Sequence, residues 1–314
     1  MTHRHIIIAG SGRSGTTWIQ DVLAEANSLR TIFEPLHPMG VPRARHLAHR
    51  YVGAEEDNPD LRRFFDDLFA GRLTGLWPDY RIRPDRFNLV THGLREFFQN
   101  TRKLVRHRRK YRDHRSRDSV VVKFIRANLM LSWIARHYDV PILFVVRHPC
   151  AVIASRMKIG GGDWDARKAL ERYLVDRRLI DLIRERYGVD ITRTDLAQEE
   201  LLAMVWCIEN MLPISWSTVY GFEVVSYEGL MTAPETEWRR VVNGLELLHV
   251  PDEKLLGAPS QQVAPDMRNK EVGISNSAKW KSELSDRQLD RIDKVLKEFG
   301  CTSYSIDNEF FMPA

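Results

Sequence analysis

The stretch GSGRSGTT, residues 10–17, decides the fold of this chain. An apolar run at residues 5–9 precedes it, and the length of that run is typical of a short, fully buried strand. The segment that follows, residues 16–27, has the apolar spacing of a helix, carried by Trp18, Ile19, Val22 and Leu23. A strand, a glycine-rich turn and a helix in this order predict a phosphate-binding unit, because the backbone N–H groups at the helix start attract an anion.

The loop has the glycine spacing of a nucleotide-triphosphatase P-loop without the lysine of that motif. Gly10 and Gly15 match the motif, but Thr16 stands in the place of the lysine, and Thr17 follows it. Without the lysine, metal-dependent transfer of a γ-phosphoryl group loses its main charge clamp. The glycines alone still fit a kinase that acts on a small molecule, and they also fit a tight turn that only starts a helix. The basic Arg13 and the hydroxyl groups around it favour an anion site.

Further apolar runs predict a parallel sheet. Residues 119–125 and 141–146 have the pattern of buried strands, and residues 129–138 between them have helical spacing. A strand, a helix and a strand in this order place the two strands parallel in one sheet. Residues 222–226 add a fourth strand. We therefore expect an α/β fold of three layers, a central parallel sheet flanked by helices, with ligand sites at the carboxyl ends of the strands.

The length of 314 residues fits one large α/β domain, and we interpret residues 1–314 as one unit. Two segments, at about residues 38–118 and 160–215, depart from the alternation of strands and helices. The first is irregular and rich in Arg, His and Pro, whereas the second shows amphipathic helical periodicity. We expect both segments to be insertions on the substrate side of the domain.

The net charge of +5 favours an anionic partner, a class that includes phosphate-rich nucleotides, acidic glycans and nucleic acids. Nine Lys or Arg residues stand against a single acid at residues 101–117. Tyr111 is the only aromatic residue in this run, so the run lacks the interleaved aromatics of a nucleic-acid surface. It is either a solvated helix face or a patch for an anionic acceptor. A basic nucleic-acid-binding protein is the non-enzymatic alternative, although we expect no nucleic-acid partner.

The cysteines and the apolar runs bear on the cellular compartment. Cys150, Cys207 and Cys301 are far apart and form no CxxC pair, which argues against a disulfide framework and a structural zinc site. No apolar run reaches the roughly 18 residues of a membrane span, and the N-terminal run is too short for a signal peptide. The sequence therefore predicts a cytoplasmic protein without a transmembrane segment.

A second candidate anion site follows the strand predicted at residues 141–146. Arg147 comes directly after this strand, and Pro149 predicts the start of a helix that carries Ser155. An arginine at a strand end and a serine two turns into the next helix can converge on one phosphate. Two separate phosphate sites suit a nucleotide that bears both 3′- and 5′-groups.

These motifs resemble those of the sulfotransferase family, whose donor is 3′-phosphoadenosine 5′-phosphosulfate. Residues 11–18 match the family's 5′-phosphosulfate loop, and the spacing from Arg147 to Ser155 matches its R-x-P-x-x-x-x-x-S motif for the 3′-phosphate. The matched segments are about residues 6–37, 120–155 and 227–234, with a looser match toward the C-terminus. The resemblance implies a P-loop-like sulfotransferase fold with helical insertions and transfer of a sulfuryl group to an acceptor hydroxyl. It also implies adenosine 3′,5′-bisphosphate as the product and no required metal.

The resemblance further implies a role for each residue of the two anion sites. The loop residues in contact with the 5′-phosphosulfate are Gly12, Arg13, Ser14, Gly15, Thr16 and Thr17. Arg13 takes the place of the family's loop lysine at the bridging oxygen, and Trp18 packs against the adenine. Arg147 and Ser155 bind the 3′-phosphate.

Two later segments resemble the family less closely. Tyr227 lies in a segment similar to the family's Y-E-D-L strand end, and the resemblance assigns it to the adenine. The family's cofactor-closing loop is matched only in part, because its R-K-G sequence is not intact here. Arg268 and Lys270 are the residues of that segment that the resemblance assigns to the 3′-phosphate.

Sulfuryl transfer to a hydroxyl needs a base, for which the resemblance offers Glu34. The small-molecule branch of the family uses a histidine in a K-T-H segment, whereas this chain has Lys123 followed by Phe124 and Ile125. The FEP segment at residues 33–35 is similar to the [FY]-E-P segment of carbohydrate and protein-tyrosine sulfotransferases, in which the glutamate is the proposed base. His37 is the alternative base or a substrate ligand. Pro35 predicts an extended backbone at Glu34.

Two cations near the expected sulfate position complete the candidate site. Lys123 lies on an apolar strand, where a lysine without an anion is costly. We therefore expect Lys123 to face the sulfate and to stabilise charge on the leaving group, while Arg126 assists it or binds the acceptor. Because Glu34 resembles the glutamate of the carbohydrate-type branch, the resemblance implies an acceptor hydroxyl on a carbohydrate, a glycolipid or a related metabolite, with anionic glycans among the candidates.

Overall fold

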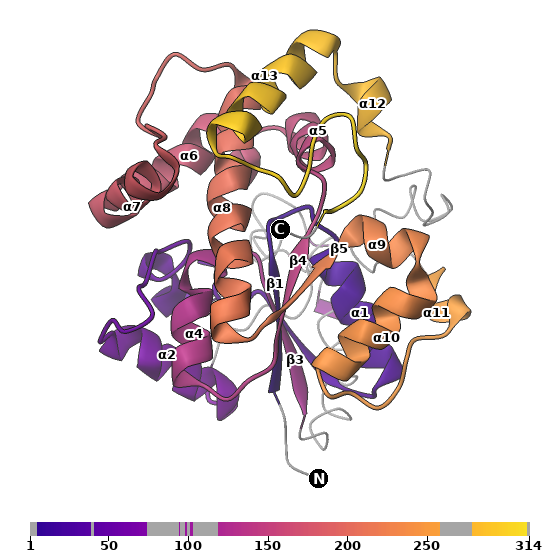
Figure 1. Ribbon diagram of the computed structural model, residues 1–314. Coiled ribbons are helices and arrows are strands. Elements are labelled where there is room, and N and C mark those ends of the chain that lie inside the picture. Colours follow the sequence, from indigo (N-terminus) through magenta and orange to yellow (C-terminus); the bar gives the residue numbers. More distant parts are fainter. Residues whose placement is uncertain are drawn as a thin grey trace.

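A twisted parallel sheet forms the centre of the computed structural model, which describes residues 5–38, 41–73, 94, 98, 101–102, 119–257 and 278–312. The sheet has the strand order β2-β3-β1-β4-β5, and every adjacent pair is parallel (Figure 1). The strands are β1 (His5–Gly10), β2 (Arg30–Phe33), β3 (Val120–Phe124), β4 (Ile142–Val146) and β5 (Glu223–Ser226). The strands β2 and β3 lie on one side of β1, and β4 and β5 lie on the other side. The order of the strands therefore reverses beside β1.

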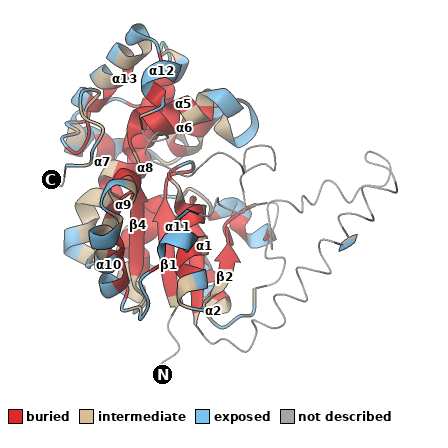
Figure 2. Ribbon diagram, turned by 90° about the vertical axis from the view of Figure 1, so that its right-hand side faces the viewer, coloured by how far each residue is buried: buried red, intermediate tan, exposed pale blue. Residues whose placement is uncertain are grey.

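The alternation of side chains along each strand divides the apolar residues between two cores. In β1, Ile6 and Ile8 belong to one buried cluster, whereas Ile7 and Ala9 belong to the other. This division is the period-two pattern of a strand that is covered on both faces. Figure 2 shows the strands as the most continuously buried part of the molecule.

Helices cover both faces of the sheet. The cluster that contains Ile6 and Ile8 is closed by α1 (Thr16–Ala26), α9 (Tyr227–Thr232), α10 (Pro234–Gly244) and α11 (Glu253–Leu256). The cluster that contains Ile7 and Ala9 is closed by α2 (Pro59–Phe69), α4 (Leu131–His137) and α8 (Gln198–Tyr220) (Figure 1). The predicted three-layer α/β fold with a central parallel sheet is therefore confirmed.

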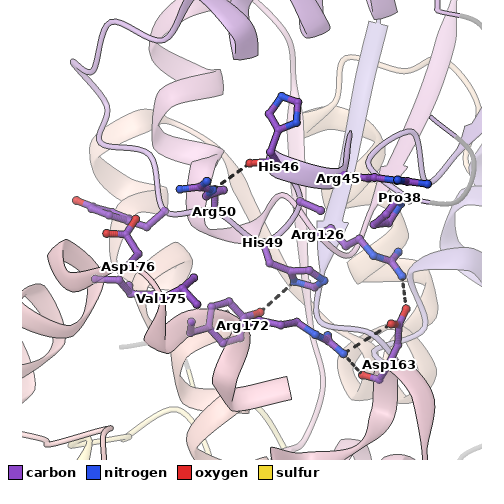
Figure 3. Close-up of a pocket in the computed structure, with 14 residues that line it drawn as sticks. Pro38, Arg45, His46, His49, Arg50, Arg126, Asp163, Arg172, Val175 and Asp176 are labelled. Atoms are coloured by element: carbon purple, nitrogen blue, oxygen red, sulfur yellow. Dashed lines mark hydrogen bonds and ion pairs between the residues drawn. The ribbon is translucent and has the colours of Figure 1, made fainter. Parts of the chain in front are cut away.

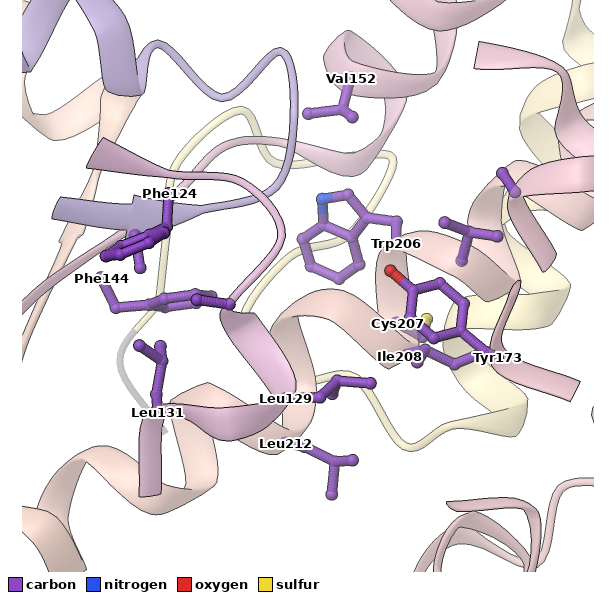
Figure 4. Packing of buried hydrophobic residues seen from close by; sticks show 14 of the residues in the cluster. Phe124, Leu129, Leu131, Phe144, Val152, Tyr173, Trp206, Cys207, Ile208 and Leu212 are labelled. Carbon is purple, nitrogen blue, oxygen red and sulfur yellow. The ribbon is translucent and has the colours of Figure 1, made fainter. Parts of the chain in front are cut away.

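A small residue at the centre of the sheet leaves room for two rings. Ala9 is in register with Phe124 of β3 on one side and with Phe144 of β4 on the other. Both phenylalanines are fully buried in the same cluster, part of which Figure 4 shows together with Leu131. Adding side-chain volume at Ala9 would overpack this layer.

Another group of helices lies beyond the carboxyl ends of the strands, around the N-terminal part of α8 (Figure 1). It consists of α5 (Pro149–Ile159), α6 (Ala166–Leu174), α7 (Arg177–Tyr187), α12 (Trp280–Glu283) and α13 (Asp286–Glu298). Three short 3-10 helices complete the described elements: η1 (Pro42–His46), η3 (Asn128–Met130) and η4 (Gly162–Trp164). Among the residues that the structure describes, no helix is both long enough and apolar enough to cross a membrane.

The strands predicted at residues 5–9, 119–125, 141–146 and 222–226 are all present as β1, β3, β4 and β5. The short strand β2 was not predicted. It has four residues, begins with the polar pair Arg30 and Thr31, and pairs only with β3 at the edge of the sheet. Its sequence therefore lacks the apolar run that marks the buried strands. This edge strand matters for the site because it delivers Glu34 to the carboxyl end of β3.

His148, just after β4, binds the C-terminal segment at Ser305 and Asn308 through hydrogen bonds. Its Nδ1 accepts a hydrogen bond from the backbone N–H of Cys150 and so caps α5, while Nε2 lies 3.0 Å from the carbonyl of Ser305 and 3.2 Å from that of Asn308. These partners require a neutral ring with its proton on Nε2. The ring also stacks on Trp280, with 4.5 Å between the ring centroids. Burial lowers the pKa of His148 to about 4.

We predict that His148 makes the protein less stable as the pH falls from about 6.5 to 4. The folded protein holds this ring neutral down to a pKa of about 4, whereas the unfolded chain takes up a proton near pH 6.5. The unfolded state therefore binds more protons in this window, and the unfolding free energy decreases by up to about 3 kcal/mol toward pH 4. Urea unfolding of the wild-type chain and of His148→Asn at several pH values measures this loss.

The variant should lose less stability than the wild type between pH 6.5 and 4, although it starts from a lower value at pH 7.5. His249→Asn, which changes an exposed histidine, serves as the control and should keep the wild-type pH dependence. Equal pH dependence in His148→Asn and the wild type would contradict the prediction.

Candidate active site

The glycine-rich loop joins β1 to α1, and neighbouring rings determine where it needs glycine. Gly15 has a φ of 87° and precedes the first residue of α1, where a Cβ atom would lie 2.5 Å from the ring of Tyr227. A Cβ atom on Gly12 would collide with the ring of Trp164. Both glycines are thus required by close approach of an aromatic ring, and Gly15 also by its left-handed backbone. The loop is therefore enclosed by protein on two sides.

The loop presents polar groups that have no hydrogen-bond partner among the residues that the structure describes. The Oγ atom of Ser14 is buried and accepts or donates no hydrogen bond within the described residues. The N-cap residue of α1 is Gly15, which has no side chain to accept a hydrogen bond from the first N–H groups of this helix. A buried hydroxyl next to an uncapped helix N-terminus fits an anion of the size of a phosphate or sulfate group. The predicted phosphate loop thus has the local structure that its sequence indicates.

The two predicted anion sites lie side by side. The Nε atom of Arg13 donates to Ser155 Oγ at 2.9 Å, and Nη1 of Arg147 donates to the carbonyl of Arg13 at 3.1 Å. The guanidinium of Arg147 also lies over the ring of Tyr227, 4.6 Å from its centroid. The buried Nε of Arg147 has no hydrogen-bond partner within the described part of the chain. The structure therefore brings together four of the residues that the sequence assigned to the nucleotide.

Trp18 lies beneath this cluster rather than on its surface. Its ring is buried and contacts Tyr227 and Trp238 edge to face, with centroid distances of 5.9 and 5.6 Å. The predicted contact between Trp18 and an adenine stays a prediction. In this structure Trp18 supports the ring of Tyr227, which itself packs against Arg147 and Gly15.

Glu34 is fully buried between two cations. Its Oε1 lies 3.1 Å from Nζ of Lys123, and its Oε2 accepts a 2.7 Å hydrogen bond from Nη1 of Arg126. The lysine also donates to Oγ1 of Thr17 at 3.3 Å, in the first turn of α1. These contacts connect the predicted base, the predicted lysine and the phosphate loop in one chain. Three separate segments contribute to it, namely the end of β2, the end of β3 and the start of α1.

The backbone at Glu34 is not extended, so the expectation based on Pro35 is wrong. Glu34 has a φ of 45°, in the left-handed region. Its N–H donates to the carbonyl of Lys123 at 3.0 Å, and its own carbonyl accepts from the N–H of His37 at 2.9 Å. These two hydrogen bonds continue the pairing of β2 with β3 and then close a turn. The unusual conformation directs the carboxylate into the protein instead of toward solvent.

Lys123 has protein anions around it in this structure. Burial lowers its pKa, and the ion pair with Glu34 opposes this effect. The ammonium group lies 3.9 Å from the centre of the Phe33 ring, which adds a cation–π contact. The cost of burying a lysine is thus offset by Glu34 and Phe33, and the expected contact with a sulfate stays a prediction.

His37, the alternative base, is buried near the same cations. Burial, followed by the positive charge of Arg126, lowers the pKa of His37 to about 4. The imidazole is therefore neutral near pH 7 and able to accept a proton, although with little driving force. Arg126 also donates to Asp163 Oδ2 at 2.7 Å, so this arginine joins the carboxylates of Glu34 and Asp163.

A buried hydrogen-bond network that the sequence did not reveal contacts the loop at Ser11 and Gly12. Arg156 donates to Glu209 at 2.6 Å and to the carbonyl of Gly12 at 3.2 Å, and both side chains are 95% buried or more. Glu209 also accepts from Ser11 Oγ at 2.8 Å and from the hydroxyl of Tyr173 at 2.9 Å. The available signal was a charged residue within the apolar run of α8, since a buried carboxylate requires a partner.

A pocket of about 430 Å³ opens beside Arg126 (Figure 3). Its basic lining residues are Arg45, His46, His49, Arg50, Arg126 and Arg172, and its acidic ones are Asp163 and Asp176. The apolar part of its wall comes from Pro38, Ala48, Val175 and Leu179, together with the rings of Tyr51 and Tyr173. Because Arg126 both lines the pocket and binds Glu34, the pocket is next to the candidate base.

Two sequence predictions lie outside the described residues. They are the assignment of Arg268 and Lys270 to the 3′-phosphate and, apart from residues 101 and 102, the basic run at residues 101–117. No structural statement applies to them.

We predict that Glu209→Gln destabilises the protein by about 3–5 kcal/mol, because it leaves the buried Arg156 without its counter-charge. The matched control is Glu55→Gln, which removes an ion pair with Arg136 of 2.9 Å whose side chains are 76% and 59% exposed. That change should cost less than about 1 kcal/mol. Urea unfolding of both variants measures these two losses of unfolding free energy. Equal losses in the two variants would contradict the prediction.

Comparison with known proteins gave matches only among solved structures. No protein-family model matches the chain, and no curated protein matches its sequence. The sulfotransferase domain from the curacin biosynthetic pathway is 14% identical with a TM-score of 0.48, over 95% of this chain and 98% of that one. The sulfotransferase domain of the olefin synthase from Synechococcus PCC 7002 is 18% identical with a TM-score of 0.47, over 96% and 97% of the two chains. A sulfotransferase from Alicyclobacillus acidocaldarius is 14% identical with a TM-score of 0.36, over 95% and 97%.

Proposed function

We propose that this chain is a sulfotransferase that moves the sulfuryl group of 3′-phosphoadenosine 5′-phosphosulfate to an acceptor hydroxyl. The observation that carries the proposal is the contact between the phosphate loop and the buried ion pair of Lys123 and Glu34. Lys123 reaches both Thr17 of the loop and Glu34, with distances of 3.3 and 3.1 Å. An anion in the loop would therefore lie next to a cation and a carboxylate, as transfer to a hydroxyl requires.

The two anion sites support a donor with two phosphate positions. The loop, with the buried hydroxyl of Ser14 and the start of α1, suits the 5′-phosphosulfate. Arg147 and Ser155 suit the 3′-phosphate, because the buried N–H at Nε of Arg147 is available to donate a hydrogen bond to it. Tyr227, which packs against both Gly15 and Arg147, lies between these sites and provides a ring for the adenosine.

The proposed reaction is an in-line displacement at sulfur. The acceptor oxygen attacks the sulfur atom, and a new S–O bond forms as the bond from sulfur to the bridging oxygen of the phosphosulfate breaks. The electron pair of the broken bond stays on the phosphate of adenosine 3′,5′-bisphosphate, and the acceptor proton goes to Glu34 or His37. Arg13 and Lys123 supply positive charge to the leaving phosphate, so the proposal calls for no metal ion.

Donor binding would change the partners of Glu34. A phosphosulfate in the loop competes with Glu34 for Lys123, whose ammonium group already contacts Thr17. If Lys123 turns to the donor, Oε1 of Glu34 becomes available to an acceptor hydroxyl, while Oε2 stays fixed by Arg126 at 2.7 Å. The base would then be formed only when the donor is present. The acceptor, on this proposal, is a carbohydrate, a glycolipid or a related hydroxyl-bearing metabolite.

We predict that labelled sulfate passes from 3′-phosphoadenosine 5′-phosphosulfate to an acceptor in the absence of added Mg²⁺. Calorimetry should show that adenosine 3′,5′-bisphosphate binds and that Arg147→Gln weakens its binding by about 10- to 100-fold, because a charge-assisted contact is lost. Adenosine 5′-monophosphate, which lacks the 3′-phosphate, should bind the wild type and Arg147→Gln alike.

Arg136→Gln, at an exposed arginine that pairs with Glu55, is the control and should bind adenosine 3′,5′-bisphosphate as the wild type does. Tight binding of ATP with Mg²⁺, without binding of the bisphosphate, would overturn the proposed function in favour of a kinase.

A further prediction concerns the base. Glu34→Gln should lower kcat by about 100-fold or more, because general-base catalysis contributes on that scale. Binding of adenosine 3′,5′-bisphosphate should not weaken by more than about threefold, because the loss of the Glu34 charge leaves Lys123 available to the nucleotide. Glu34→Asp keeps the charge between Lys123 and Arg126 while moving the carboxylate, so it separates loss of the base from loss of folding.

His37→Asn tests the alternative in the same assay. If His37→Asn abolishes transfer while folded Glu34→Gln retains it, the base is His37. Circular dichroism of each variant establishes that the fold is intact.

A further inference from the structure

We propose that the pocket beside Arg126 binds an acceptor that carries an anionic group, such as a carboxylate, in addition to the hydroxyl that receives the sulfate. This inference rests on the proposed function and specifies the substrate class of the same site. It assigns recognition of the acceptor's charge to the walls of the 430 Å³ pocket.

The pocket lies where an acceptor must lie. Arg126 forms part of its wall and donates to Glu34 Oε2 at 2.7 Å, so a hydroxyl next to Arg126 is close to the candidate base. Pro38, another lining residue, follows His37 directly in the chain. On its far side the pocket reaches Val175, which is 78% exposed, so the pocket has a mouth. The reacting hydroxyl therefore enters toward Arg126 while the rest of the acceptor stays nearer the mouth.

The charges of the pocket wall do not balance. Arg126 and Arg172 share Asp163, through contacts of 2.7 and 3.7 Å. Arg126 also binds Glu34, which lies outside the wall and is itself shared with Lys123. The other acid of the wall, Asp176, is held by Arg178 at 3.1 Å.

Arg45 and Arg50 complete the basic part of the wall. Within the part of the chain that the structure describes, neither has a carboxylate partner, and Arg50 donates only to the carbonyl of His46. The wall thus has four arginines and two acids, and one of these acids, Asp176, is already paired with Arg178 outside the wall. This surplus of positive charge attracts an anion.

This positive charge acts on two histidines, the half-buried His49 and the buried His37. Burial lowers the pKa of His49 well below its ordinary value, and the positive charges of Arg126 and Arg172 lower it further. His37 is affected by Arg126 in the same direction. His49 lies in the pocket wall, 3.2 Å from the hydroxyl of Tyr173, and its imidazole stays neutral near pH 7. The positive potential of the pocket is therefore supplied by arginines, and it persists over the physiological pH range.

The arrangement of the arginines indicates how the acceptor is oriented. Figure 3 shows Arg45 and Arg126 on the side of Pro38, and Arg50 on the side of Val175 and Asp176. Arg126 is buried and committed to two carboxylates, whereas Arg45 and Arg50 are exposed. The anionic group of the acceptor is therefore held by Arg45 or Arg50, and the hydroxyl points toward Arg126 and Glu34. The rings of Tyr51 and Tyr173 and the side chain of Leu179 provide an apolar wall for the body of the acceptor.

Matched pairs of probes test the charge preference. The first pair is 4-hydroxyphenylacetate and 4-hydroxyphenylacetamide, and the second is methyl β-D-glucuronide and its uronamide. Each pair differs only by a carboxylate against an uncharged amide of similar shape. Ligand-observed NMR titration measures their affinities for the full chain, with and without adenosine 3′,5′-bisphosphate.

At least one carboxylate should bind the wild type about tenfold more tightly than its amide partner, and this ratio should decrease as salt screens the arginines. In the double variant Arg45→Gln with Arg50→Gln, the ratio should fall to about two or less.

Arg43→Gln is the matched control. It removes the same charge from the same short helix, η1, but Arg43 is bound to Asp67 at 2.9 Å and does not line the pocket. This variant should keep the tenfold ratio. A ratio near one in the wild type, no measurable carboxylate binding, or an unchanged ratio in the double variant overturns the inference.

Binding of adenosine 3′,5′-bisphosphate shows whether the inference about the acceptor or the proposed function has failed. If adenosine 3′,5′-bisphosphate does not bind, the proposed function fails, while the charge preference of the pocket is still measured without it. If the nucleotide binds and sulfate is transferred equally well to both members of each pair, only the inference about the acceptor fails.

Discussion

The structure of the site depends on the buried ion pair between Arg156 and Glu209. Arg156 comes from α5 and Glu209 from α8, and their 2.6 Å contact joins two helices that lie beyond the carboxyl edge of the sheet. Removing two charges from water is costly, and the pair recovers that cost only because further polar groups satisfy both side chains. Those groups are the carbonyl of Gly12, the hydroxyl of Ser11 and the hydroxyl of Tyr173. The same network therefore fixes the phosphate loop and one wall of the neighbouring pocket.

A second buried cluster contacts the loop at Thr17 and performs a different task. Glu34, Lys123 and Arg126 neutralise one another in part, and Lys123 extends the cluster to Thr17. Since Arg126 also lines the pocket, one continuous set of charged side chains runs from the phosphate loop to the proposed acceptor position. Donor binding and acceptor binding would compete for these charges. On the proposed mechanism, such competition would set the order of binding, because Glu34 would become available to an acceptor only after a donor had drawn Lys123 away.

Local patterns predicted most of the fold, and long-range contacts account for the differences. The buried strands were identifiable because each is an apolar run bounded by breakers, whereas β2 is short, polar at its start and recruited by β3. The conformation of Glu34 was predicted incorrectly because the local restriction from Pro35 is weaker than the two hydrogen bonds that hold Glu34 in its turn. The Arg156–Glu209 pair could not be assigned from sequence spacing, since 53 residues separate its members. The charge of Glu209 within an apolar helix was its only local sign.

The sequence alone determined that a glycine-rich loop follows the first strand and that its glycines and hydroxyls are confined to residues 10–17, and it predicted that Arg147 and Ser155 form a second anion site. Those features depend on short segments whose backbone and side chains act together over one turn. The tertiary structure decided which charges meet: Glu34 with Lys123 and Arg126, Arg13 with Ser155, and an excess of arginine in one pocket. The physical reason is that a Coulomb interaction depends on distance in space and on exclusion of water. Both are set by the packing of helices and strands that the chain brings together from remote positions.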